Sequence, residues 1–113
     1  MKRDSHRFDD LFKSFGPIQL RRMFGGEGIY AGGTMIGLVF EDRLYLKAGD
    51  LNRADFLAED CEPFTYSHGK KIVSMSYYEV PERLLDDPEE FGEWARKAQA
   101  AALAPKKPRK KAR

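Results

Sequence analysis

The chain has 113 residues, which is enough for one domain of common size. A hydrophobic content of 42%, with 12% aromatic residues, is ample for a packed core and excludes a globally disordered chain. The net charge of +2 hides an asymmetry, because residues 105–113 carry six of the 20 basic residues and no acidic one. We therefore expect a mildly acidic folded domain over residues 1–103 and a disordered basic tail over residues 104–113.

The sequence contains no segment that is typical of a membrane protein or an exported one. No apolar run approaches the roughly 20 residues that cross a bilayer, and the first residues lead into no signal-peptide apolar stretch. Cys61 is the single cysteine, so it cannot form an internal disulfide and makes a structural zinc site improbable. We expect a cytoplasmic protein without a membrane partner, in which Cys61 is a small buried hydrophobe.

An amphipathic helix is predicted at the start of the chain, over residues 4–15. Its apolar positions follow the i, i+3, i+4, i+7 spacing that places side chains on one helix face: Phe8, Leu11, Phe12 and Phe15. Asp4 or Ser5 is available as the N-cap. Gly16-Pro17 ends the helix, because proline cannot continue its hydrogen bonds.

A meander of four strands is predicted next, and paired glycines separate its first members. Glycine adopts positive φ angles at no steric cost, so Gly25-Gly26 and Gly32-Gly33 indicate sharp reversals, and Glu41-Asp42 indicates a third turn. The strands around these turns are Ile18–Phe24, a segment around Ile29-Tyr30, Met35–Phe40 and Leu44–Lys47.

The second half of the chain predicts helix, two strands and helix. Asp50 is a candidate N-cap for a helix over Leu51–Glu59, and Asp87-Pro88 starts the last helix with an N-cap acid and a proline at the first helical position. Between them lie strands at Phe64–Tyr66 and Ile72–Val80, joined by a turn at residues 67–70. The order α-β-β-β-β-α-β-β-α with tight turns predicts an α+β fold, in which helices flank a mainly antiparallel sheet in two layers.

No residue pattern supports a catalytic, cofactor or metal site. Residues 26–31 match the dinucleotide fingerprint G-x-G-x-x-A, but they are predicted as strand and turn, whereas the fingerprint needs a following helix to receive the pyrophosphate. His6 and His68 have no ligand partner at metal-binding spacing. An enzyme on a small sheet stays an alternative, which would require a concave pocket with convergent polar groups.

Two surfaces are candidates for binding. The tail could neutralise several phosphates of a nucleic acid without reading its sequence, or could be only a solubilising terminus; its cations are Lys106, Lys107, Arg109, Lys110, Lys111 and Arg113. The second candidate is a sheet face on which Tyr45 is partly exposed beside Lys47 and Arg21. Such an aromatic and basic face could stack bases or contact a protein, although a half-buried tyrosine with a solvated hydroxyl is the more common arrangement.

Several motifs in order resemble the N-terminal domain of the TfoX (Sxy) competence regulators, over about residues 8–102. The motifs are Arg22-Met23-Phe24-Gly25-Gly26-x-Gly28-Ile29-Tyr30, Leu44-Tyr45-Leu46-Lys47, Pro63-Phe64-x-Tyr66, Ser74-Met75-Ser76-Tyr77-Tyr78-x-Val80-Pro81 and the helix from Asp87-Pro88-Glu89 to Trp94-Ala95.

The resemblance implies a small α+β domain and a role in transcription. Family members linked to natural transformation are positive regulators, thought to help a cyclic-AMP-dependent activator at competence promoters. Those longer members resemble this chain in their first half, and the basic tail stands here where their second, helical domain follows. The family implies no catalytic residues and no cofactor. We thus expect a non-enzymatic accessory regulator with a transcription-protein partner; a small nucleic-acid-binding module is the alternative, and the oligomeric state stays open.

Overall fold

The computed structural model describes residues 8–23, 25–68 and 71–104. Six strands form one antiparallel sheet with the spatial order β1-β2-β3-β4-β6-β5. The strands are β1 (Gln19–Met23), β2 (Gly26–Ala31), β3 (Thr34–Phe40), β4 (Arg43–Lys47), β5 (Pro63–His68) and β6 (Lys71–Glu79). The predicted α+β class with a mainly antiparallel sheet is confirmed.

Two-residue turns join β2 to β3 and β3 to β4 at the predicted positions, whereas Gly26, which was predicted in the first turn, is the first residue of β2. Ala31 pairs with Thr34 and Phe40 with Arg43, so each of these hairpins has only two residues between its strands. Gly32 and Gly33 have φ angles of 59° and 85°, which glycine adopts freely. The β3–β4 turn uses Glu41 and Asp42 at φ angles of 52° and 64°, an uncommon conformation for residues with side chains.

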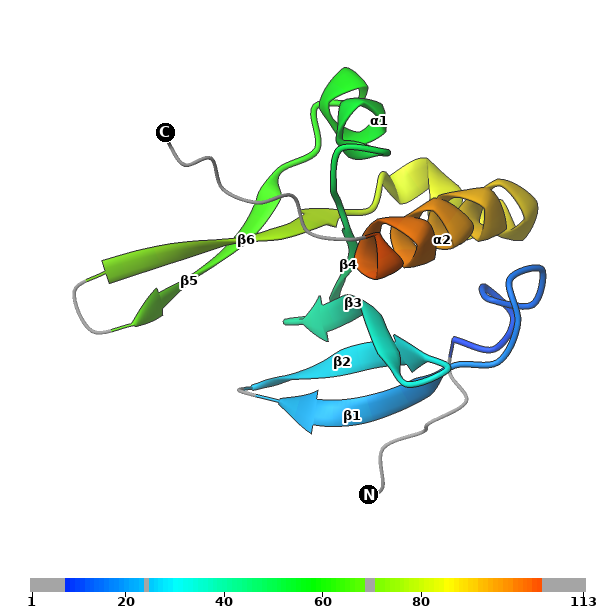
Figure 1. The fold of residues 1–113 in the computed structure, drawn as a ribbon, viewed down its shortest axis with the longest axis horizontal. Helices are drawn as coiled ribbons and strands as arrows, with labels where there is room; N and C mark the ends of the chain where they lie inside the picture. The colour runs from blue at the N-terminus through cyan, green and yellow to red at the C-terminus, as the bar shows by residue number, and fades with distance from the viewer. Residues whose placement is uncertain (1–7, 24, 69–70, 105–113) are drawn as a thin grey trace.

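All helices of the described chain cover one face of the sheet (Figure 1). They are α1 (Arg53–Ala58), the 3-10 helix η1 (Glu82–Asp86) and α2 (Pro88–Leu103), of which α2 contacts β3 and β4. Asp87 caps α2 as predicted, because its carboxylate accepts a hydrogen bond from the Glu90 N–H at 3.2 Å. Between the helices and the sheet lies the main core, which includes Ile29, Ile36, Leu46, Phe56, Phe91 and Ala95.

Residues 8–15 form successive turns rather than the predicted α-helix, whose first residues lie outside the described chain. The apolar stripe is nevertheless real, since Phe12 is 1% exposed and its ring meets that of Phe91 edge-on at 4.8 Å. So short a helix is marginal in water, and tertiary contacts decide its backbone. Here Arg96 donates to the Ser14 carbonyl at 2.9 Å, and Ser14 Oγ donates to the Pro88 carbonyl at 3.2 Å.

The helix after β4 begins later than predicted, and a different residue stands at its N-terminus. The structure has α1 over Arg53–Ala58, with Asn52 rather than Asp50 at the N-cap position. Asn52 is 2% exposed; its side chain accepts from the Gly49 N–H at 2.8 Å and donates to the Lys47 carbonyl at 2.9 Å. These bonds fix the chain reversal from β4 into α1, so the first residues of the predicted helix form a turn instead.

A second, smaller core lies on the sheet face that the helices leave open. It consists of Leu38, Tyr45, Phe64 and Tyr77, with Met35 and Phe40 packed against it. The Phe64 ring contacts Tyr45 at 5.1 Å and Phe40 at 5.2 Å, both edge-on. Side chains of β5 and β6, rather than of a helix, thus pack over the apolar residues on this face. Among the described residues, no helix has both the length and the apolar character needed to cross a membrane.

Candidate functional site

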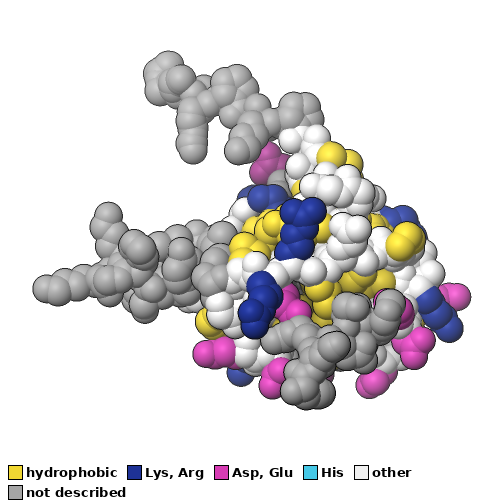
Figure 2. Space-filling view, turned by 90° about the horizontal axis from the view of Figure 1, so that it is seen from below, with side chains coloured by type: hydrophobic (Ala, Val, Ile, Leu, Met, Phe, Trp, Pro, Cys, Tyr) yellow, Lys and Arg dark blue, Asp and Glu magenta, His cyan; other side chains and the backbone are white. Residues whose placement is uncertain are grey.

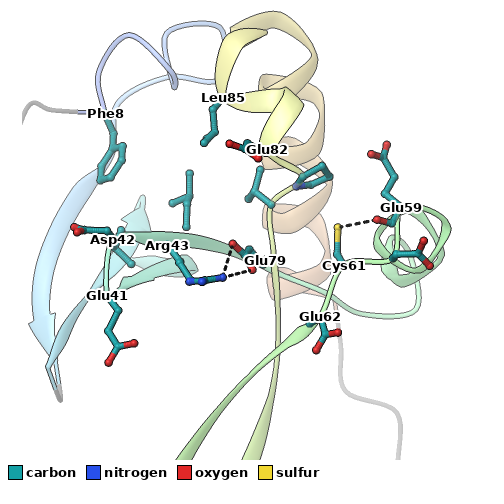
Figure 3. Close-up of a pocket in the computed structure, with 15 residues that line it drawn as sticks. Phe8, Glu41, Asp42, Arg43, Glu59, Cys61, Glu62, Glu79, Glu82 and Leu85 are labelled. Carbon is teal, nitrogen blue, oxygen red and sulfur yellow. Dashed lines mark hydrogen bonds and ion pairs between the residues drawn. The ribbon is translucent and has the colours of Figure 1, made fainter.

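A groove of about 790 Å³ opens beside the ends of β4 and β6 (Figure 3). Its walls come from the β3–β4 turn, the loop after α1, the end of β6 and η1. The described residues that line it include six apolar ones, Phe8, Val39, Leu44, Val80, Pro81 and Leu85, and seven acidic ones, Glu41, Asp42, Glu59, Asp60, Glu62, Glu79 and Glu82. The Glu41 and Glu62 side chains point away from the space between Phe8, Leu85 and Glu79 (Figure 3). Among the described residues that line it, Arg43 is the one basic residue.

The acidic walls are built from points where the chain changes direction. Glu41 and Asp42 form the β3–β4 turn, and Asp60 lies in the turn after α1 with a φ angle of 59°. Glu79 ends β6, and Glu82 begins η1. Because the ends of these elements meet at one corner of the sheet, acids far apart in the sequence share one groove.

Two arginines neutralise part of this charge. Arg43 pairs with Glu79 at 3.2 Å inside the groove, and Arg83, at its edge, pairs with Glu59 and with Glu90 of α2. Hydrogen bonds from Arg83 hold the pKa values of the Glu59 and Glu90 carboxyls below their usual range. Within the described chain, no ion pair involves the other five groove acids: Glu41, Asp42, Asp60, Glu62 and Glu82.

Cys61 lines the groove, and its surroundings disfavour the thiolate form. It is partly buried rather than fully buried as predicted, and its Sγ lies 3.9 Å from the Glu59 carbonyl. Burial raises the pKa of the Cys61 thiol, and the neighbouring carboxylates of Glu59, Glu79 and Asp60 raise it further. A thiol must lose its proton to act as a nucleophile or metal ligand, so this arrangement disfavours both roles. The described residues hold no group of three or more His, Cys, Asp or Glu suited to a metal ion.

The open sheet face brings together the three residues that the sequence singled out. Arg21 pairs with Gly28 across β1 and β2, and the row continues through Leu38 to Tyr45 on β4. Lys47 lies two residues beyond Tyr45, so its side chain is on the same face. Three strand spacings separate Arg21 from Tyr45, or about 14 Å.

Arg21 and Lys47 each lie over an aromatic ring. Arg21 Cζ is 4.7 Å from the centroid of the Tyr30 ring, and Lys47 Nζ is 5.2 Å from that of Tyr77. Lys47 Nζ also donates to Ser76 Oγ at 2.8 Å. In the view from below in Figure 2, basic side chains lie near the middle of the visible surface among patches of hydrophobic side chains, and acidic side chains lie mainly toward its edge.

The prediction that Tyr45 is partly exposed is wrong, because only 9% of it is accessible. The Phe64 ring from β5 covers it, and burial raises the pKa of its hydroxyl, with a smaller contribution from the Glu79 carboxylate. A ring packed in this way has no free face on which a nucleobase could stack. Arg21 and Lys47 are therefore the accessible members of the predicted partner surface.

The acidic groove was not predicted from the sequence, because only the sheet order shows that several of its acids meet. A usable signal was the recurrence of acids at the breaks between predicted elements, as at Glu41-Asp42 and Glu59-Asp60. The six tail cations, His6 and the side chain of His68 lie outside the part of the chain that the structure describes.

Comparison with known proteins gives one family and one curated relative. The family model described as the TfoX N-terminal domain matches residues 10–102. The chain is 34% identical over 76 residues to the protein named DNA transformation protein TfoX1 of Aliivibrio fischeri (strain ATCC 700601 / ES114). That alignment covers 67% of this chain and 36% of the relative, so the chain spans about a third of the curated protein that it matches.

Proposed function

The chain belongs to the TfoX N-terminal domain family, and from this premise we propose that it is a non-enzymatic accessory regulator of transcription, connected with competence or DNA uptake, that acts through a protein partner. The observation that carries the proposal is the family match over residues 10–102, which includes nearly all of the described fold. The name of the relative supports the connection with DNA transformation.

The chemistry of the groove favours a binding role over an enzymatic one. Burial and neighbouring carboxylates raise the pKa of its thiol, and none of the described residues that line it is a histidine that could act as general base. The groove thus lacks an activated nucleophile, although it has the concave shape that an active site needs.

The open sheet face is the surface that we propose for the protein partner. Arg21 and Lys47 are held in place over tyrosine rings, so little side-chain freedom is lost when a partner binds them. Arginine, tyrosine and methionine are enriched in protein interfaces, and this face combines Arg21 with Tyr30 and the partly buried Met35.

Affinity purification of the full chain from its native host, with and without nuclease, tests the protein-partner proposal. We expect a transcription protein to be recovered after nuclease treatment. The Arg21→Ala/Lys47→Ala double variant should lose it, whereas Arg22→Ala/Lys13→Ala should retain it. The control pair has the same charge change, and Arg22 lies next to Arg21 in β1 but points to the other face. Recovery of no transcription protein, or equal recovery by both variants, would contradict the proposal.

A second candidate function is a nucleic-acid-binding module that uses the tail. The supporting observation is the density of six cations within nine residues and their separation from the acidic body. If all six contact phosphates of duplex DNA, the logarithm of the binding constant should fall with the logarithm of salt concentration at a slope of about −5. Replacing the six cations by glutamine in the full chain should abolish binding. Binding that survives this replacement would exclude the tail as the contact.

A further inference from the structure

The acidic groove and the basic tail are complementary in charge and belong to one chain. The groove contributes seven carboxylates and one guanidinium, and five of the carboxylates have no ion pair within the described part of the chain. The tail contributes six cations and no acid. We propose that the groove binds the basic segment of residues 105–113 of the same molecule. This inference does not depend on the proposed regulatory function.

The apolar residues of the groove make it more than a negatively charged surface. Phe8 and Leu85 both line it, and Leu85 is 47% exposed (Figure 3). Lysine and arginine side chains have long aliphatic stems that can cover apolar surface while the charged end reaches a carboxylate. A groove lined by both apolar and acidic residues therefore fits such side chains better than it fits small inorganic cations.

The tail is long enough to reach the groove. Glu82 and Leu85 of η1 line the groove, and η1 directly precedes α2, so the groove lies near the N-terminal end of this helix, whereas the tail leaves from its C-terminal end. The 16 residues of α2 span about 24 Å at 1.5 Å per residue. Ten extended residues, 104–113, span about 33 Å. The last part of the tail, with Lys110, Lys111 and Arg113, can therefore lie in the groove.

Binding of the tail in the groove has a direct consequence for nucleic acid. The same cations cannot contact carboxylates and phosphates at once, so the groove competes with any phosphate backbone for the tail. The acidic walls would keep the tail from weak, non-specific contacts, and only a surface of high negative charge density would displace it.

Paramagnetic relaxation in the full-length chain tests the proposal. A nitroxide label is attached at Ala112→Cys in a Cys61→Ser background, and the amide signals of residues 41–43, 60–62, 79, 80 and 82 are followed in isotope-labelled protein. We expect strong broadening of these signals relative to those of the far end of β1. In 0.5 M salt, where exposed charges are screened, the relaxation enhancement of the groove signals should fall by a factor of about three or more.

Matched charge variants determine whether the groove is responsible. The variant Asp42→Asn/Glu62→Gln/Glu82→Gln should lose the broadening, whereas Asp10→Asn/Glu89→Gln/Glu93→Gln, with the same charge change at exposed acids outside the groove, should retain it. The dispersion of the amide spectrum shows whether each variant is folded. Broadening that is absent, or equal in both variants, would overturn the proposal.

A mixing experiment separates binding within one molecule from binding between copies. Spin-labelled protein without isotope label is mixed with isotope-labelled protein that carries no spin label. Intramolecular binding predicts no groove broadening in this mixture. The reference is the protein that carries the spin label and the isotope label on the same molecule. Broadening in the mixture as strong as in this reference would show that the tail of a second copy occupies the groove, which would overturn the intramolecular proposal.

Discussion

Arg43 lies within the acidic groove with its Nη1 atom 3.2 and 3.3 Å from the two carboxylate oxygens of Glu79. The pair joins the start of β4 to the end of β6, since Tyr45 and Glu79 are neighbours across these strands. Arg43 is the one cation among the groove residues, so it occupies a carboxylate that a bound cationic segment would otherwise use. The ion pair thus limits how strongly the groove attracts a basic ligand.

Replacing this cation should strengthen binding of the tail. In Arg43→Gln, Glu79 becomes available and the net charge of the groove becomes more negative. The side chains are 60% and 35% exposed, so the pair is worth at most about 1 kcal/mol, or about a fivefold change in the equilibrium constant for tail binding. We expect increased broadening of the groove signals in the spin-label experiment. Arg53→Gln is the control, because Arg53 pairs with Asp50 outside the groove; an equal increase in that variant would refute the prediction.

Arg83 predicts a specific dependence of stability on pH. The pKa values of Glu59 and Glu90 are lowered in the folded protein, chiefly by hydrogen bonds from Arg83. A lowered pKa means that the stabilisation is present above the pKa of the unfolded chain, near pH 4 to 5, and is lost as pH falls through the lower folded value.

Urea unfolding between pH 7 and pH 3 measures this effect. Arg83→Met should have a weaker loss of stability below pH 5 than the wild-type chain, because two carboxyls regain ordinary pKa values. Arg53→Met is the comparison, since Arg53 holds one exposed carboxylate by a 3.4 Å contact. The same pH profile in Arg83→Met and wild type would show that the Arg83 contacts do not persist in solution.

The sequence predicted the sheet well, because its signals are local. Two-residue turns at Gly32-Gly33 and Glu41-Asp42 and the apolar run of β3 fix the hairpins without information from distant residues. The burial of Tyr45 was not predictable in this way. Alternation places Tyr45 opposite Leu44 and Leu46, but only the position of Phe64, which comes from a distant strand, shows that the second face is also covered.

The helices show the limits of periodicity. The stripe of residues 8–15 correctly identified core residues, yet hydrogen bonds to α2 draw this segment into turns. The η1 helix was missed because its five residues are too few to show a repeat. The groove could not be predicted, since it depends on the ends of four elements meeting at one corner of the sheet.

Asn52, rather than Asp50, should be the residue that stabilises the start of α1. Asn52→Ala leaves the Gly49 N–H and the Lys47 carbonyl without their side-chain partner at a buried position, which should cost about 1 to 3 kcal/mol. Asp50 is exposed, so Asp50→Ala should cost no more than about 0.5 kcal/mol. Urea unfolding compares the stabilities of the two variants. A larger loss of stability in Asp50→Ala than in Asn52→Ala would contradict this prediction and would favour Asp50 as the N-cap, as the sequence indicated.

Gly92 in α2 allows the close approach of residues 8–15, and a double-mutant cycle can measure this contact. A Cβ atom at Gly92 would lie 2.0 Å from Ser14 Oγ, so Gly92→Ala forces Ser14 to rotate and give up its hydrogen bond to Pro88. Alanine in a helix interior gains about 1 kcal/mol over glycine, which opposes this cost. We expect Gly92→Ala to be neutral or destabilising in the wild-type chain.

In a Ser14→Ala background the obstructing hydroxyl is absent, so Gly92→Ala should become more favourable by at least about 1 kcal/mol. The Ser14 Cβ, at 3.3 Å from the added methyl, needs to move only slightly. The free energies of unfolding of the wild type, both single variants and the double variant give the coupling. A coupling near zero would mean that residues 8–15 do not pack on α2 at this point, and that the Arg96 contact to Ser14 does not hold the segment there.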